Sequence, residues 1–436
     1  MPRLFDLIYL LAMLVAGPVW LWRLIRTGKW RTDWPARFGR CSIAPPAEGK
    51  RRILIHAVSV GEVNATRRLV EQLSKRKGGE VEVVISVTTD TGLARARQVY
   101  DGKCEVVRYP LDFSWSVRLF LSAVQPNAVA LMELEVWPTF VSECDRRSIP
   151  VVVLNGRLSE RSYRRYRLIR PLIRRAFARL AGVAAQDPAY ADRFVGLGAR
   201  RGVVGVAGNM KWDTATIADD EPGSETLAAA MGIDRNLPLV VVGSSGRGEE
   251  AMVVRELTGL EMEGKPVQIL IAPRKPERFD EAAAVMGDGV VRRTRCPDSM
   301  RRIPDDRRLF LLDTIGELRR AYALANVVIV GRSFCPLHGS DMIEPIALGK
   351  PVVIGPNVAD FRDVMDRLLE GGGVKQVAGP DHLREAVAAM FCNQGPDVAE
   401  KGRAVIRTQQ GATDRNLRTL ETAMGQATQD PSRKGG

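Results

Sequence analysis

The sequence predicts an α/β protein built from two doubly wound, Rossmann-like domains. Short apolar runs typical of buried strands alternate with longer amphipathic runs typical of helices, as in parallel sheets covered on both faces. The length of 436 residues exceeds that of a usual single domain. A turn-rich acidic run, IADDEPGS at residues 217–224, divides the alternation into two series. We therefore expect two domains, each with its own parallel sheet, facing a cleft.

Composition favours a globular protein with an anionic partner. There are 64 Lys and Arg residues against 51 Asp and Glu, a formal net charge of +13. Such an excess suggests nucleic acid, a membrane surface or a phosphorylated substrate. The six cysteines show no C-x-x-C spacing and are expected to be reduced. With only three histidines, a His-based metal cluster is not expected. No GxGxxG follows the strand at 53–58, so a dinucleotide cofactor is not indicated either.

The N-terminus is predicted to be a membrane anchor over residues 1–27. Residues 7–22, LIYLLAMLVAGPVWLW, are uncharged, and the basic residues Arg23, Arg26, Lys29 and Arg31 follow them. Positive charge after the segment places the next domain on the cytoplasmic side. The alternative is a helix packed on the protein's own core.

The first series of elements forms an N-terminal domain over residues 28–216. Strands are expected at 53–58, 81–87, 106–109, 128–132, 151–154 and 182–185. Helices are expected at 61–74, 89–99, 114–124, 138–147, 163–180 and 188–197. The helix at 163–180 is strongly basic.

The second series forms a C-terminal domain over residues 217–400. Strands are expected at 239–242, 268–271, 309–311, 327–330 and 352–354. Helices are expected at 249–260, 276–285, 315–324, 342–348 and 381–391. One further helix at 401–424 closes the chain, and the polar tail at 425–436 is predicted to be disordered.

Acidic residues follow two strands of the first domain. Glu62 stands at the strand-to-helix turn of HAVSVGE, where the helix N-terminus should stabilise the ionised carboxylate that a base requires. Glu133 and Glu135, in MELEVWP, follow another strand and could face the same space. Taken alone, Glu62 could equally be an N-terminal helix charge.

Glycine-rich and basic turns follow two strands of the second domain. Ser244 and Ser245, in GSSGRGEE, lie where small residues let the backbone approach an anion at a helix start. Arg274 and Lys275 follow the next strand and place two cations at the same edge. Several anion-friendly loops at successive strand ends favour a phosphorylated ligand.

The loop Gly331–Asp341 is the first place to look for this ligand. Gly339, Ser340 and Asp341 precede a helix whose exposed N–H groups suit a phosphate, and Glu344 could accept hydrogen bonds from hydroxyl groups. A phosphate site beside a diol acceptor suits a ribonucleotide. Alternatively, Asp341 is only an N-cap and Glu344 only complements the helix dipole.

These segments also resemble a known family. HAVSVGEVNA, MELEVWP, LNGRLSERSY, AAQD, GN-x-KWD, GSS-x-x-GEE, APRKPERF, DTIGEL and EP-x-ALGKPV-x-x-GP occur in this order. In this set the chain is similar to 3-deoxy-D-manno-octulosonic acid (Kdo) transferases of lipopolysaccharide biosynthesis. The resemblance runs from the N-terminal segment to about residue 360.

The resemblance implies a GT-B glycosyltransferase that moves Kdo from CMP-Kdo to a lipid A precursor. It implies action at the cytoplasmic face of the inner membrane, without a metal or bound cofactor. The catalytic base of the family falls on Glu62, and a second glutamate falls on Glu133 or Glu135, of which Glu133 is favoured. The CMP contacts that it implies are Ser244, Ser245, Arg274, Gly316, Glu317 and Glu344, with Lys275 and Ser340 added from the loops described above.

One departure from the family pattern concerns the donor site. The family usually has Gly-Gly-His-Asn before Leu-Glu-Pro, whereas this chain has His338, Gly339, Ser340 and Asp341 before its Glu-Pro. An Asp here would place a negative charge near the CMP phosphate or the Kdo carboxylate. Ser340 or His338 could supply the lost hydrogen-bond donor.

Other functions stay open at this point. A membrane-associated GT-B enzyme could use another nucleotide sugar, such as a uridine-linked one, and a non-catalytic module could use the basic charge to bind anionic lipid. Arginines crowd residues 157–175 and could contact acceptor phosphates and an anionic membrane surface, or form a solvated basic face. Nucleic acid is not expected, because Trp and Tyr cluster near the anchor instead of on a basic face.

Overall fold

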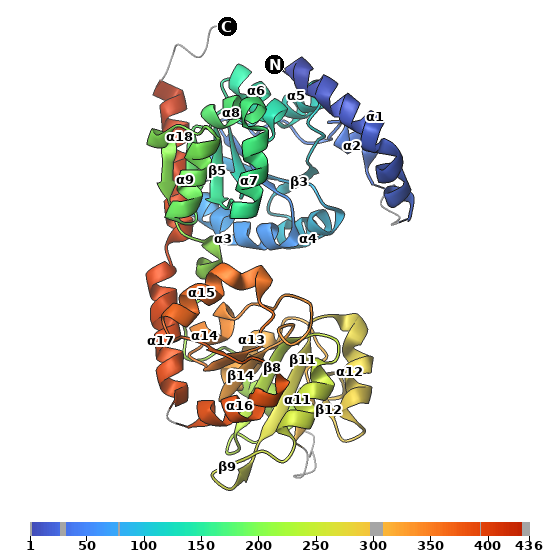
Figure 1. Cartoon of the computed structure of the whole chain (residues 1–436), viewed down its shortest axis with the longest axis vertical. Helices are drawn as coiled ribbons and strands as arrows, with labels where there is room; N and C mark the ends of the chain where they lie inside the picture. The colour runs from blue at the N-terminus through green and yellow to red at the C-terminus, as the bar shows by residue number, and fades with distance from the viewer. Residues whose placement is uncertain (1, 27–31, 77–78, 297–307, 393, 430–436) are drawn as a thin grey trace. The chain divides into compact units, whose positions relative to one another are not determined.

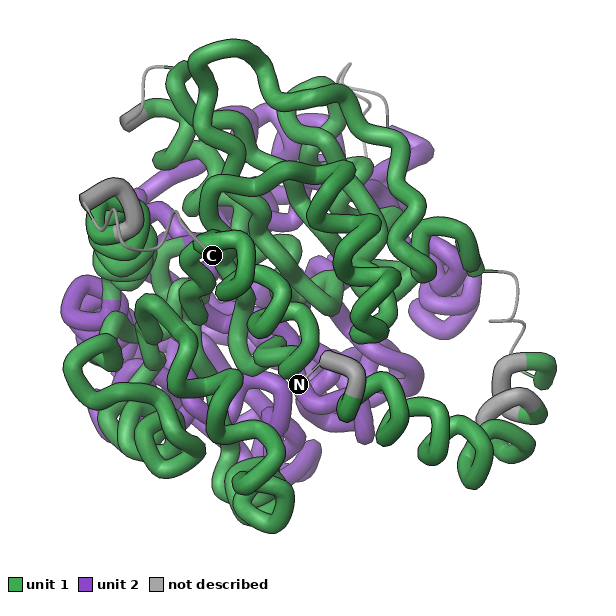
Figure 2. Tube along the Cα trace, turned by 90° about the horizontal axis from the view of Figure 1, so that it is seen from above, with its two compact units in different colours: residues 1–213, 410–436 green, residues 214–409 purple. Residues whose placement is uncertain are grey.

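The computed structural model describes residues 2–26, 32–76, 79–296, 308–392 and 394–429. The chain forms two compact units, shown in different colours in Figure 2. Unit 1 contains Met1–Asp213 and Gln410–Gly436, and unit 2 contains Thr214–Gln409. The chain therefore leaves unit 1 after Asp213 and returns to it at Gln410, just before its last helix.

Unit 1 is built on a parallel sheet of seven described strands in the order β3-β2-β1-β4-β5-β6-β7. They are β1 (Arg51–Ala57), β2 (Val81–Val87), β3 (Glu105–Arg108), β4 (Ala128–Met132), β5 (Val151–Gly156), β6 (Gly182–Ala185) and β7 (Val204–Val206). The central strands are apolar and buried because helices cover both faces of the sheet. This confirms the predicted parallel sheet, to which β7 is an addition.

The helices of unit 1 cover both faces of this sheet, except that the N-terminal helix packs outside them, against two of the other helices (Figure 1). They are α1 (Pro2–Arg26), α2 (Trp34–Arg37), α3 (Val60–Arg76), α4 (Asp90–Tyr100), α5 (Ser114–Val124), α6 (Pro138–Arg146), α7 (Glu160–Leu168), α8 (Arg170–Ala178), α9 (Pro188–Leu197) and α18 (Ala412–Gln429). One core contains apolar side chains of α3, α4 and α18, and the opposite core contains those of α5, α6, α8 and α9.

Unit 2 repeats the arrangement with described strands in the order β12-β13-β11-β8-β14-β15-β16, all parallel. They are β8 (Leu239–Ser245), β11 (Gln268–Pro273), β12 (Val291–Arg292), β13 (Leu309–Leu311), β14 (Val327–Val330), β15 (Val352–Ile354) and β16 (Lys375–Gln376). A separate hairpin joins β9 (Glu261–Met262) to β10 (Lys265–Pro266).

Helices also accompany the strands of unit 2. They are α10 (Ser224–Met231), α11 (Glu249–Leu257), α12 (Phe279–Met286), α13 (Leu318–Leu324), α14 (Ile343–Ala347), α15 (Arg362–Glu370), α16 (Leu383–Phe391) and α17 (Gln394–Gln409). Short 3-10 helices occur at Arg201–Val203, Met210–Thr214, Pro276–Arg278, Arg293–Arg295, Ala359–Phe361 and Pro380–His382. The predicted strands at 309–311, 327–330 and 352–354 are confirmed residue for residue.

Two predicted helices are each two helices in the structure. The basic helix expected at 163–180 breaks at Ile169, because Pro171 lies in the first turn of α8 and cannot continue α7. The helix expected at 401–424 breaks at Gly411, whose φ is +87°. Its second half, α18, continues to Gln429, so placing the start of the tail at residue 425 was wrong, and residues 430–436 lie outside the described residues.

The predicted N-terminal anchor corresponds to α1. Its outward side chains are apolar and strongly exposed, with Leu14 79% and Val15 81% exposed. Within the described residues, none of the helices meets the length and hydropathy needed to cross a membrane. Lys29 and Arg31 of the predicted basic flank lie outside the described residues.

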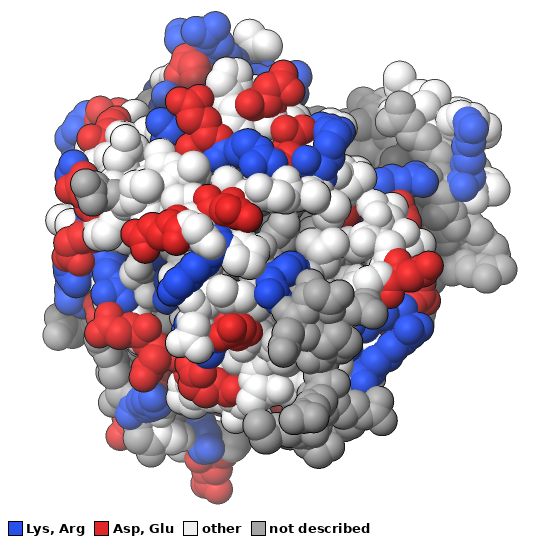
Figure 3. All heavy atoms as spheres, turned by 90° about the horizontal axis from the view of Figure 1, so that it is seen from below, with Lys and Arg blue, Asp and Glu red and all other residues white. Residues whose placement is uncertain are grey.

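The basic excess is not concentrated on the face drawn in Figure 3. There, Lys and Arg side chains are interspersed with Asp and Glu over the described surface. Mixed charge of this kind produces little long-range field. This face therefore offers no continuous basic patch to an anionic partner.

Asp213 fastens the returning chain to unit 1. Its buried carboxylate accepts hydrogen bonds from the amides of Gly411, at 2.7 Å, and Thr413, at 2.5 Å, at the start of α18. The neighbouring Trp212 is fully buried. We expect Asp213→Ala to lower the free energy of unfolding of unit 1 by about 2 kcal/mol, because two buried amides lose their acceptor.

Urea denaturation monitored by Trp fluorescence measures this loss. Asp213→Asn keeps one acceptor oxygen and should lose less. Asp192→Ala removes an exposed ion pair with Arg201 in the same unit and should change the free energy by less than about 0.5 kcal/mol. Equal midpoints for Asp213→Ala and Asp192→Ala would contradict the role given to Asp213.

Candidate functional site

Each sheet contains a point beside its first strand at which the strand order reverses. In unit 1 it lies between β1 and β4, and in unit 2 between β8 and β14. Ligands of such sheets bind beyond the carboxyl ends of the strands at this point. Glu62 follows β1, Glu133 follows β4, and Ser244 and Ser245 end β8. The candidate residues predicted from the sequence therefore lie at the carboxyl ends of the strands in each sheet.

Glu62 lies in the first turn of α3 and folds back onto the preceding loop. Its carboxylate accepts hydrogen bonds from the Val58 amide at 2.8 Å and from Ser59 Oγ at 3.0 Å. The Glu62 amide in turn lies 3.4 Å from Ser59 Oγ, an arrangement close to a capping box. These contacts hold the side chain in one orientation. They show the capping role of Glu62, and its role as a base stays a prediction.

The pKa of Glu62 is raised to about 7. Burial is the largest cause, and the negative charges of Glu133 and Glu135 add to it, whereas the hydrogen bonds from Val58 and Ser59 oppose it. The expectation that the helix N-terminus would favour the ionised form was therefore wrong in net direction. A carboxyl group with a pKa near 7 is suited to accept a proton at neutral pH.

Glu133 and Glu135 complete an acidic cluster with Glu62. Glu133 adopts φ +56°, a conformation unusual for a residue other than glycine, and its amide donates to Leu154 O at 3.0 Å. Glu135 accepts a hydrogen bond from Trp137 Nε1 at 2.8 Å. Burial and the charge of Glu133 raise the pKa of Glu135. The structure thus brings both predicted candidates of this loop to the same site as Glu62.

His56, which the sequence did not single out, lies under this cluster. Its Nδ1 is 3.1 Å from the carbonyl oxygen of Ser86, which can only accept, so Nδ1 carries the proton. Its Nε2 is 3.9 Å from Glu135 Oε2. Complete burial lowers the pKa of His56 to about 3, so the ring is neutral and this contact is not an ion pair. The sequence pattern around His56 is that of a buried strand and does not predict its contact with Glu135.

The α7 helix also approaches the acidic cluster. Burial and the charge of Glu135 raise the pKa of Tyr166, which lies on α7. Several arginines of residues 157–175 have partners of their own: Arg164 pairs with Glu160, Arg167 lies over the ring of Tyr163, and Arg170 donates to Gly196 O. The stretch is thus partly structural, although it borders the site.

In the glycine-rich loop of unit 2, the carboxylate of Glu249 occupies the position expected for a bound anion. The buried carboxylate of Glu249 accepts hydrogen bonds from the amides of Gly246, Arg332 and Phe334 at 2.6–2.8 Å. These amides come from the loops after β8 and β14. Amide groups that the sequence suggested for a phosphate are therefore occupied by Glu249.

Ser245 is likewise engaged within the loop. Its hydroxyl donates to Glu250 Oε1 at 2.6 Å, and Arg278 binds the same carboxylate through two nitrogens at 2.9 Å. Ser244, with φ +59°, and Ser245 are both buried. Their contact with a nucleotide stays a prediction, and the Ser245 hydroxyl is already bonded to Glu250.

Glu344, Arg274 and Tyr322 form a second titratable cluster. Burial and the charge of Asp341 raise the pKa of Glu344 to about 7, while Arg319 and Arg274 oppose the shift. Tyr322 is buried directly under Gly243, where a Cβ atom would lie 1.8 Å from its hydroxyl. Nothing in the local sequence pattern pointed to Tyr322 or Arg319.

The other predicted contacts lie on loops at this edge. Gly316, with φ +95°, and Lys275 are exposed, and Glu317 is paired with Arg293 at 3.2 Å. Ser340 is buried, and its Oγ has no hydrogen-bond partner among the described residues. A buried hydroxyl without a partner is uncommon and marks a point where this loop could rearrange.

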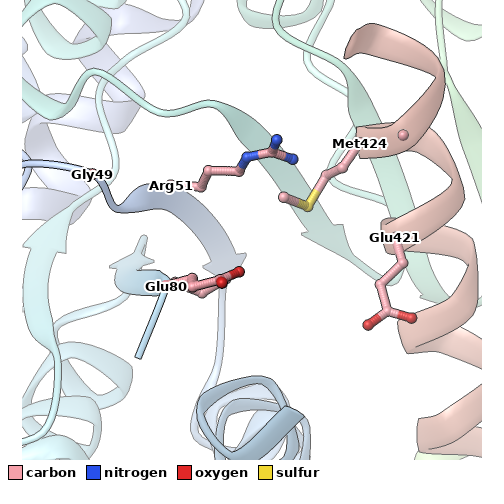
Figure 4. A pocket seen from close by; sticks show the side chains of 7 residues that line it. Gly49, Arg51, Glu80, Glu421 and Met424 are labelled. Carbon is pink, nitrogen blue, oxygen red and sulfur yellow. The ribbon is translucent and has the colours of Figure 1, made fainter. Parts of the chain in front are cut away.

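A pocket of about 510 Å³ in unit 1 lies at the opposite end of the sheet. Figure 4 shows Arg51 at the start of β1, Glu80 before β2, and Glu421 and Met424 on α18 around it. Arg51 and Glu80 stand at the amino ends of β1 and β2. The pocket is therefore separate from the acidic cluster, which stands at the carboxyl ends.

Solved structures of similar fold come from several enzymes. Alr3699/HepE of Anabaena, solved with UDP-glucose, superposes with a TM-score of 0.54 over 86% of this chain and 99% of its own, at 14% identity. MurG of Acinetobacter baumannii gives a TM-score of 0.53 over 85% and 99%, at 15% identity. At these identities the likeness establishes the fold, and it agrees with the predicted GT-B type.

Sequence comparisons identify the family. A family model described as 3-deoxy-D-manno-octulosonic-acid transferase (kdotransferase) matches residues 32–214. The 3-deoxy-D-manno-octulosonic acid transferase of Bordetella pertussis is 32% identical over 96% of this chain and 99% of its own. The enzyme of the same name from Haemophilus influenzae is 29% identical over 91% and 92%. The chain therefore belongs to the 3-deoxy-D-manno-octulosonic acid transferases, a family of glycosyltransferases.

Proposed function

We propose that this enzyme transfers Kdo from CMP-Kdo to a lipid A precursor, with inversion at the anomeric carbon. The observation that carries the proposal is Glu62, a half-buried carboxylate with a pKa near 7 at the end of β1. Glu62 removes the proton from an acceptor hydroxyl as its oxygen bonds to the anomeric carbon of Kdo. The bond from that carbon to the phosphate oxygen breaks, and CMP leaves with the electron pair.

Unit 2 supplies groups suited to the nucleotide. Arg274 and Lys275 are exposed directly after β11 and can meet the negative charge of the leaving phosphate. Glu344 can accept hydrogen bonds from the ribose hydroxyls when it is ionised. Asp341 adds a negative charge beside Glu344, so the cations are needed to offset repulsion of the phosphate.

Mass spectrometry of a lipid A precursor incubated with CMP-Kdo tests the reaction. An increase by one or more Kdo masses is expected with the wild-type protein and not with Glu62→Gln. A uridine-linked sugar is the alternative donor, and thermal stabilisation by UDP in place of CMP would favour it. Binding to anionic lipid without any sugar transfer would favour the non-catalytic alternative.

The N-terminal helix supports a location at the cytoplasmic face of the inner membrane. Its N-terminal half is bonded to unit 1 through Asp6 and Tyr9, while Leu10, Leu11, Leu14 and Val15 point outward and are exposed. A helix held along the domain in this way fits one that lies in the headgroup region with its apolar face in the acyl chains. The exposed Leu168, Ile169 and Leu172 beside the arginines of α7 and α8 offer a second contact with an anionic surface.

Glu62→Gln should lower kcat by about 10²–10⁴-fold, the contribution of a general base. The amide oxygen of Gln still accepts from Val58, so the fold is kept. In the wild type, kcat/KM should rise with pH through about 7 and then level off, because only the ionised Glu62 accepts a proton. Steady-state transfer rates from pH 5 to 9 measure this profile.

Glu133→Gln is the matched variant for this profile. It removes a neighbouring negative charge that raises the pKa of Glu62, so the rising limb should move to lower pH. A Glu62→Gln protein that transfers Kdo at the wild-type rate would exclude Glu62 as the base.

Glu344→Ala should weaken CMP binding by about tenfold or more, because hydrogen bonds to an ionised group are among the stronger ones. Isothermal titration calorimetry with CMP measures the loss. Glu370→Ala, which removes an exposed partner of Arg367 in the same unit, is the control and should bind CMP as the wild type does. A larger loss of acceptor binding than of CMP binding would assign Glu344 to the acceptor instead.

Replacing Leu14 and Val15 together with Gln should weaken binding to phosphatidylglycerol vesicles by about 100-fold, since two exposed apolar side chains no longer enter the acyl region. Vesicle co-sedimentation measures the partitioning. Val285→Gln replaces an exposed valine of α12 and should leave binding unchanged. Undiminished binding of the Leu14 and Val15 variant would mean that α1 does not provide the membrane contact.

A further inference from the structure

The N-terminal half of α1 is bonded to unit 1 by two polar side chains. Tyr9 Oη donates to Asp112 Oδ2 at 2.8 Å, and the ring of Tyr9 packs edge-on against Phe113 with centroids 5.8 Å apart. Asp6 Oδ1 accepts from the Ser114 amide at 2.7 Å, and its other oxygen accepts from Ser114 Oγ. Phe5 is buried beside them. Figure 1 shows this end of α1 next to α5.

These contacts end at the starts of two helices that have no local cap. Neither α5 nor α6 receives a hydrogen bond from the side chain at its own N-cap position, Phe113 or Trp137. The first amides of a helix need an acceptor from elsewhere. Asp6 supplies it for Ser114 in α5, and the buried Asp112 supplies it for Thr139, at 3.0 Å, and Phe140, at 2.7 Å, in α6.

The loop that carries the acidic cluster runs directly into α6. Glu133 and Glu135 lie within five residues of Pro138, the first residue of α6. Because Asp112 holds the first turn of α6, it also fixes the end of this loop. Tyr9 in turn holds Asp112, which cannot keep a single orientation as firmly with one hydrogen bond fewer. A continuous chain of contacts therefore runs from α1 to the carboxylates next to Glu62.

We propose that α1 acts on the site through its contact with α6, and that Tyr9 and Asp112 are positioning residues for the loop of Glu133 and Glu135. The expected effect on kcat rests on the proposed transfer reaction. The expected effect on the loop before α6 does not depend on that reaction. Loss of the Tyr9 hydroxyl then loosens the first turn of α6 and displaces the loop from its catalytic geometry.

Tyr9→Phe tests the proposal, because it removes one oxygen atom and keeps the ring packed on Phe113. Hydrogen–deuterium exchange of the Thr139 and Phe140 amides in detergent should accelerate about fivefold. With detergent-dispersed acceptor, kcat should fall by a similar factor, about fivefold, while KM for CMP-Kdo stays constant. Binding to phosphatidylglycerol vesicles should equal that of the wild type, which separates positioning from anchoring.

Tyr100→Phe is the matched control. Tyr100 Oη is bonded to Thr66 in a buried part of the same unit, so its loss costs a similar hydrogen bond without touching Asp112. Exchange at Thr139 and Phe140 should then stay at the wild-type rate. Asp112→Asn, which keeps one acceptor oxygen and the size of the side chain, should accelerate their exchange more than Tyr9→Phe does.

Three results would overturn the proposal. The Thr139 and Phe140 amides could exchange at the wild-type rate in Tyr9→Phe, or their exchange could accelerate equally in Tyr100→Phe. In an enzyme that transfers Kdo, faster exchange in Tyr9→Phe with unchanged kcat would also overturn it. If the wild-type protein transfers no Kdo, the proposed function fails, and the exchange rates alone still decide whether α1 holds the loop.

Discussion

Buried carboxylates that accept backbone N–H groups determine where the candidate site residues stand. Parallel sheets leave amides at the starts of helices and in the loops after strands without a partner, and buried amides need one. In this chain Glu249 binds amides of two loops in unit 2, Asp112 binds the first turn of α6, and Asp213 binds the start of α18. Each joins segments distant in sequence, so each loop depends on a residue outside itself.

The half-buried carboxylate of Glu62 likewise accepts a backbone N–H group, but its pKa is raised. It also accepts hydrogen bonds from its own loop, which favour the ionised form, but burial and two neighbouring carboxylates outweigh them. Each hydrogen bond fixes the direction of the carboxylate, while the surroundings set its affinity for a proton. A base needs both properties: a fixed position near the acceptor hydroxyl and a pKa near the working pH.

The sequence predicted strands and strand ends well because these depend on local pattern. A buried parallel strand is a continuous apolar run, and β4, β13, β14 and β15 agree residue for residue with prediction. The helix breaks at Ile169 and Gly411 were missed although Pro171 and Gly411 themselves signalled them. Occupation of the glycine-rich loop by Glu249 depends on contacts more than eighty residues away in sequence, which no local pattern records. The raised pKa of Glu62 was missed because its largest cause is burial, which depends on how the loops pack and not on the local pattern.

In the proposed reaction, the base and the cations that meet the leaving phosphate have opposite electrostatic needs. A guanidinium within about 4–6 Å of a carboxylate lowers its pKa by about 1–3 units, which would make Glu62 a weaker base. A leaving phosphate needs such cations. Unit 1 surrounds Glu62 with carboxylates, whereas Arg274 and Lys275 stand in unit 2. Because the proposed base and the proposed cations belong to separate sheets, the surroundings of each can differ without weakening the other. The pKa of Glu62 then depends on burial and on the charges of Glu133 and Glu135, which lie in the loop before α6.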